Sequence, residues 1–140
     1  MTNEDTNFSI KARIVIYGFE CAYQEITDIM GINPTKAWMR GDKVHPKSNN
    51  LHKQNGWSIS SQLEEKNSSV DDQIDNLKNL VLPYIKEFKS LPKGSEVQLS
   101  CIVYAYKYWP PLSFSSNSVA FLSEIGASID LDIYDQIEEE

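Results

Sequence analysis

The sequence predicts an α+β domain in which an amphipathic helix joins two strand-helix-strand halves. Apolar residues at every second position mark strands near both ends of the chain. Between the strands, apolar steps of three and four mark helices, and a glycine ends the helix of each half, Gly31 and Gly126. We expect a mixed, mainly antiparallel sheet with the helices on one face, as in a ferredoxin-like sandwich.

The first half contains a strand, a helix and a long loop. Residues 9–17 alternate between apolar and other side chains, which predicts a strand. Residues 21–30 carry an apolar helical stripe that ends at Gly31. Residues 32–56 lack periodicity and are rich in Asn, Lys, Gly and Pro, so they predict an irregular loop. Loops of this length in a small domain tend to be functional or mobile.

A short strand and a long helix follow the loop. Trp57 and Ile59 point the same way in a predicted strand. Ser69 can cap a helix whose apolar stripe continues to residue 88. Pro83 lies inside that helix and removes a backbone donor, so we expect a kink or two abutting helices near Leu82.

The second half starts with a central strand over residues 97–105, which is apolar on both faces. Its Tyr104, Tyr106 and Tyr108 form either a sheet face packed under helices or an exposed ledge for a partner. Ser115 or Ser116 is expected to cap the next helix.

The end of that helix and the last strand complete the second half. The helix should bury Val119, Leu122 and Ile125 and end at Gly126. Residues 127–134 then alternate, which predicts a half-buried strand with three apolar side chains inward, Ile129, Leu131 and Ile133.

Length and charge narrow the class of protein. The 140 residues, 41% of them hydrophobic, suit one domain over residues 1–140, with flexible ends at residues 1–8 and 136–140. The net charge of -7 disfavours nucleic acid as a partner and favours a basic protein. Residues 36–53 nevertheless carry +4, which leaves -11 on the rest of the chain.

The ends and the cysteines indicate the cellular setting. The polar, acidic beginning lacks the basic and apolar parts of a secretion signal, and no apolar run is long enough to span a membrane. We therefore expect a cytoplasmic protein without membrane contact. Cys21 and Cys101 lack a paired spacing and are predicted to be free, buried thiols.

Five segments, in order, resemble the bacterial domain-of-unknown-function 4279 (DUF4279) family. They are Gly31-Ile-Asn-Pro-Thr, Trp38 with Gly41-Asp42, Gly56-Trp57-Ser58, Leu112-Ser-Phe, and Gly126-Ala-Ser-Ile-Asp-Leu-Asp-Ile-Tyr. The resemblance covers nearly the whole chain, and it supports the fold. It implies no activity, cofactor or catalytic residue, since the family has none established. Small acidic bacterial domains often act as immunity proteins that neutralise a toxin, and we use this analogy as an expectation.

Catalytic and metal-binding motifs are absent from the sequence. It has no phosphate-binding glycine loop, dinucleotide fingerprint, zinc-protease helix or serine elbow, which favours a non-catalytic protein. His45 and His52 lie in the loop without a neighbouring carboxylate or thiolate pattern, so we expect neither a metal nor another cofactor. Asp130 and Asp132 share one face of the last strand. They are either a solvated face, a contact for a basic partner, or paired carboxylates for catalysis.

The loop supplies the best candidate binding residues, Trp38, Arg40, Asp42 and Trp57. Aromatic residues beside arginine are typical of interfaces and stacked ligands. Alternatively, both tryptophans anchor the loop to the domain.

Two functions follow from these residues. The first is a non-catalytic module that binds a basic protein, such as an immunity-type inhibitor of a toxin. The second is a small domain that binds, or acts on, an anionic ligand through the loop between Trp38 and Trp57.

Overall fold

A computed structural model describes residues 5–138 and arranges them around a five-stranded sheet of order β2-β3-β1-β4-β5. Every neighbouring pair is antiparallel except β4 and β5, which run parallel. The α+β class and the mixed, mainly antiparallel sheet are therefore confirmed. In chain order the elements are β1 (Phe8–Tyr17), α1 (Tyr23–Met30), β2 (Lys36–Trp38), β3 (Gly56–Ser60), α2 (Val70–Val81), the 3-10 helix η1 (Leu82–Ser90), β4 (Glu96–Ala105), α3 (Ser116–Glu124) and β5 (Ala127–Asp135).

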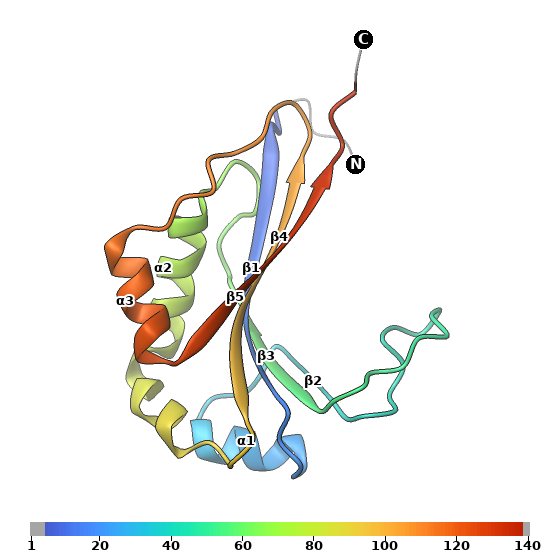
Figure 1. Cartoon of the computed structure of the whole chain (residues 1–140), viewed down its shortest axis with the longest axis vertical. Helices are drawn as coiled ribbons and strands as arrows, with labels where there is room; N and C mark the ends of the chain where they lie inside the picture. Colours follow the sequence, from blue (N-terminus) through green and yellow to red (C-terminus); the bar gives the residue numbers. More distant parts are fainter. Residues whose placement is uncertain (1–4, 139–140) are drawn as a thin grey trace.

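The helices cover one face of the sheet, which we call the core face. Alternate residues of β1 and β4 point to this face and are buried, because a strand turns successive side chains to opposite sides. Ile26 of α1, Ile74 of α2 and Phe121 of α3 join the same core. Figure 1 shows α2 and α3 side by side on this face, with residues 39–55 projecting away on the other side.

The helix between the halves divides at the proline, as predicted. Ser69 caps α2 by accepting a hydrogen bond from the Asp72 backbone N–H at 3.0 Å. The α-helix ends at Val81, and Pro83 lies in the first turn of η1, where its missing N–H does no harm.

Asp71 joins the starts of α2 and α3. Its carboxylate accepts from the Ser115 backbone N–H at 3.0 Å and from the Ser118 hydroxyl at 2.7 Å. These hydrogen bonds lower the pKa of Asp71 because they favour the charged form. Ser115, one of the two predicted caps, also accepts from the Ser118 N–H.

Three sequence expectations need correction. The stretch 32–56 is not wholly irregular, because Lys36–Trp38 forms β2 against β3. Val119 is 52% exposed, and Phe121 takes its expected place in the core. Ile129 and Ile133 lie on the core face of β5, but they are 46% and 37% exposed. The alternation of apolar and polar residues predicted the correct face for Ile129 and Ile133. It wrongly predicted that they are buried, since the helices do not cover this edge of the sheet.

The outer edge of β1 is covered beyond the end of β3. The Ser61 N–H donates to the Ala12 carbonyl, the Ile10 N–H to the Glu65 carbonyl, and the Asn67 N–H to the Phe8 carbonyl. Residues 61–67 thus continue the sheet irregularly beside β1. The predicted flexible ends fall partly on residues 1–4 and 139–140, which lie outside the described residues; Thr6 is buried.

Both cysteines are free thiols, but only Cys101 is fully buried, while Cys21 is partly exposed. Within residues 5–138, none of the helices combines the length and apolar character needed to cross a bilayer.

The Cys101 thiol should make the free energy of unfolding depend on pH in the alkaline range. Burial, followed by the nearby Asp130 charge, raises the pKa of this thiol from 9.0 to about 12. The folded protein therefore holds the proton more tightly than the unfolded chain does. This contribution to stability is complete below pH 9.0 and is lost as the pH rises towards about 12.

We expect the free energy of unfolding to fall over this pH range more steeply in the native sequence than in Cys101→Ala, by up to roughly 1.4 kcal/mol per pH unit. Urea unfolding at several pH values measures both slopes. Identical slopes would contradict the assignment.

Candidate functional site

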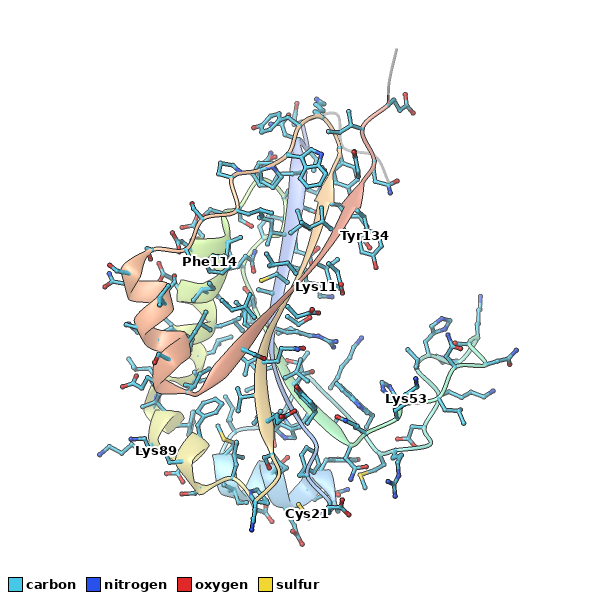
Figure 2. The ribbon with its side chains drawn as sticks, in the orientation of Figure 1. Lys11, Cys21, Lys53, Lys89, Phe114 and Tyr134 are labelled. Atoms are coloured by element: carbon cyan, nitrogen blue, oxygen red, sulfur yellow. The ribbon has the colours of Figure 1, made fainter. Side chains whose placement is uncertain are left out.

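The side of the sheet opposite the helices, which we call the open face, carries an ordered set of charges. The strand registers place Arg13, Ser100 and Asp130 in one row across β1, β4 and β5. The next row contains Lys11, Ile102 and Asp132. The open face is thus cationic on β1 and acidic on β5, at a separation of about 10 Å for two strand spacings. Figure 2 shows Lys11 and Tyr134 on the side of the sheet away from the helices.

Three tyrosines form an exposed stacked platform at one end of this face. The ring centroids of Tyr104 and Tyr134 lie 5.1 Å apart, and those of Tyr104 and Tyr106 lie 6.2 Å apart. The three rings are 36–47% exposed. Of the two readings left open for the tyrosine row, the structure therefore favours the exposed ledge over a face packed under helices.

Trp38 fixes the base of the projecting segment 39–55 to the sheet. Its ring stacks on His52 with centroids 4.7 Å apart, and the Arg13 guanidinium lies 5.8 Å from the centre of the Trp38 ring. Burial lowers the pKa of Arg13, because removing water disfavours the charged form. Gly56 makes room for this arrangement, since a Cβ there would overlap the Trp38 ring.

Arg40 and Asp42 have different surroundings near the same base. The Asp42 carboxylate accepts from the Met39 backbone N–H at 2.8 Å, so it stabilises a turn. The Arg40 backbone N–H donates to the Asn55 side-chain carbonyl at 2.7 Å, and Arg40 lines a hollow of about 250 Å³ together with Glu20. The hollow therefore holds a carboxylate beside its arginine, which disfavours an anionic ligand.

Trp57 lies in the core and cannot contact a partner. It is fully buried, and its indole N–H donates to the Thr27 hydroxyl of α1 at 3.0 Å. Trp38 pairs with Gly56, and Trp57 pairs with Ala37. The two tryptophans therefore lie in neighbouring rows of the sheet, and their side chains point to opposite faces. The structure thus does not bring the six predicted site residues together. Trp38 lies at the segment base, Trp57 lies in the core, and Asp130 and Asp132 lie exposed on β5.

The surface has two further hollows. One of about 370 Å³ lies between Phe88, Ile125 and the Tyr17–Glu96 pair, and one of about 470 Å³ lies between α2 and residues 63–68. The Glu96 hydrogen bond, burial and the negative charges of Glu96 and Asp130 raise the pKa of Tyr17. Across residues 5–138, no three His, Cys, Asp or Glu side chains are grouped so as to hold a metal ion.

A comparison with protein families shows which family this chain belongs to. The family model described as "Domain of unknown function (DUF4279)" matches residues 8–136. The chain belongs to the DUF4279 family. This match runs from the first residue of β1 to the residue after β5, so the DUF4279 region includes the open face and the projecting segment. Neither a curated protein nor a solved structure matches the chain.

The sequence did not lead us to name Arg13 or Tyr134 as site residues. Strand periodicity contains the necessary signal, because Tyr134 has the same parity as Asp130 and Asp132. It does not say which face the helices leave open. That information comes only from the packing of the DUF4279 helices against the sheet.

The space left by Gly56 gives a test of the Trp38 arrangement. We expect Gly56→Ala to lower the free energy of unfolding by about 1–3 kcal/mol, because the new methyl group overlaps the indole. In a Trp38→Ala background the same change should cost clearly less. Urea unfolding of the four proteins in this double-mutant cycle measures the coupling. Additive losses would show that the two residues do not compete for space.

Trp57 is predicted to act through stability. We expect Trp57→Phe to cost about 2 kcal/mol, because it leaves a cavity and deprives the Thr27 hydroxyl of its donor. Trp109→Phe is the matched control, since Trp109 is 49% exposed, and it should cost less than about 0.5 kcal/mol. Chemical denaturation followed by circular dichroism compares them. Equal losses in the two variants would contradict the structural role.

Proposed function

We propose that this DUF4279 protein is a non-catalytic module that binds a basic protein, in the manner of an immunity-type inhibitor covering a toxin. One observation carries the proposal. The helices leave one face of the sheet open, and its acidic edge, with Asp130 and Asp132, adjoins the exposed tyrosine platform. Tyrosine is enriched at interfaces because it offers a large, rigid and amphipathic contact.

Charge supports a basic partner. Asp130, Asp132 and Asp135 are all exposed along β5, and the chain outside residues 36–53 carries -11. Complementary charge accelerates encounter and selects against partners of the same sign. The proposed setting is the bacterial cytoplasm, where such an inhibitor would meet a toxin made by its own or a neighbouring cell.

The alternative, an anionic-ligand or enzymatic site in the loop, has weaker support. Trp57 cannot line such a site because it is buried, and Glu20 shares the Arg40 hollow. We therefore place the function on the open face.

We also propose that the two halves derive from an internal repeat. The units β1-α1-β2 and β4-α3-β5 each place a second strand parallel to the first, after a helix followed by a left-handed glycine, Gly31 or Gly126. The units differ because β3 lies between β1 and β2, whereas β5 pairs directly with β4.

Binding can be tested with the purified protein and the purified products of the adjacent genes. We expect one of these products to bind in isothermal titration calorimetry, and its toxic activity to be neutralised. Tyr104→Ala and Tyr134→Ala should each weaken the affinity by roughly tenfold.

The matched control is Leu82→Ala, since Leu82 is a large apolar residue in the helix layer and is 52% exposed, somewhat more than either tyrosine. Its affinity should equal that of the native protein. The proposal fails if none of the neighbouring products binds, or if the tyrosine variants bind as tightly as the control.

A further inference from the structure

Within the described residues 5–138, no strand pairs with the outer edge of β5. β5 is the last strand of the sheet and pairs with β4 along all nine of its residues. The other edge strand, β2, has only three residues. In Figure 1, β5 crosses the front of the sheet, and it is the last strand of the order that the described residues form. A free edge presents unpaired backbone groups to which another strand can bind.

The direction of these backbone groups follows from one hydrogen bond. The Gln136 N–H donates to the Ala105 carbonyl of β4 at 2.8 Å. Successive N–H groups of a strand point to opposite sides. Continuing this alternation back through β5, the N–H groups of Ile129, Leu131 and Ile133 point outward.

The side chains of the same edge alternate in chemistry. Ile129 and Ile133 are 46% and 37% exposed on the core face, with the partly buried Leu131 between them. Asp130 and Asp132 alternate with them and are exposed on the open face. A strand laid along this edge would meet apolar surface on one side and negative charge on the other.

We propose that an extended segment of the partner adds to β5 as a sixth strand, and that this segment alternates apolar residues with lysine or arginine. Its apolar side chains extend the core face over Ile129, Leu131 and Ile133. Its basic side chains lie opposite Asp130 and Asp132. This inference rests on the proposed function and specifies how the basic partner is recognised.

Charge favours a basic segment over a second copy of this chain in the central registers of β5. An antiparallel pair of β5 strands centred on Leu131 would place Asp130 opposite Asp132 of the second copy. Centring the pair on Asp130 or Asp132 would place that residue opposite its own copy. Like charges directly opposite one another destabilise a strand pair, whereas opposite charges stabilise it.

The probe is a synthetic peptide of alternating lysine and valine, as long as β5, titrated into the isotope-labelled full chain. We expect amide chemical-shift changes concentrated over residues 127–135. At saturation, hydrogen exchange should slow at the outward N–H groups of Ile129, Leu131 and Ile133. A glutamate-valine peptide of the same length should produce neither effect.

Charge reversal provides the matched variants. Asp130→Lys/Asp132→Lys should weaken binding of the lysine-valine peptide by roughly tenfold or more, since two attractive pairs become repulsive. The control variant is Asp28→Lys/Asp75→Lys, which changes the net charge by the same amount at exposed helix positions. It should bind the lysine-valine peptide with the affinity of the native chain. If the amide spectrum shows that the first variant is unfolded, Asp130→Asn/Asp132→Asn replaces it, with a smaller loss expected.

Three results would overturn strand addition. One is shift changes at Tyr104 and Tyr134 without slower exchange of the outward amides, which would leave face binding by a basic partner intact. Another is that, in the absence of peptide, hydrogen exchange at the outward amides slows as the protein concentration rises. This would identify a second copy as the occupant. The third is equal binding, or no binding, of the two peptides, in which case calorimetry with the neighbouring gene products still tests the proposed function separately.

Discussion

The antiparallel pairing of β1 with β4 is the interaction on which the rest of the structure depends. Each of the ten residues of β1 has a partner in β4, from Phe8 with Ala105 to Tyr17 with Glu96. One helix follows each of these strands and returns over the same face, so the two halves share one core. The same register sets the rows of the open face, because it places Lys11 and Arg13 opposite Ile102 and Ser100. The buried core and the exposed charge pattern thus come from a single alignment.

Local pattern predicted the parts of this fold that local chemistry determines. The strand alternation of β1, the Ser69 cap and the break at Pro83 each depend on neighbouring residues, and each lies where the sequence indicated. β2 was missed because three residues are too few for a period, and its pairing partner β3 lies about twenty residues away. Stability that comes from a distant strand leaves no local signature.

The candidate site was harder to predict because burial, like the pairing of β2, depends on distant parts of the chain. Periodicity assigns a side chain to one face of the sheet, but whether that side chain is buried depends on how far the helices extend over the face. Ile129 and Leu99 share the core face and the same register row, yet Ile129 is 46% exposed and Leu99 is fully buried. Trp57 shows the converse, since a tryptophan beside a loop suggested a binding residue and instead donates to Thr27 inside the core.

The net charge of -7 conceals two separate electrostatic surfaces. Residues 36–53 carry +4 and include β2, whereas the exposed aspartates lie on β5 at the opposite edge of the sheet. Four strand spacings separate these edges, or about 19 Å. This exceeds the Debye length of about 8 Å at physiological ionic strength, so the charge of Lys36 on β2 does not cancel that of the β5 aspartates in solution. A basic segment approaching the outer edge of β5 therefore meets the aspartates first, because Lys11 and Arg13 lie two strand spacings further in, at about 10 Å.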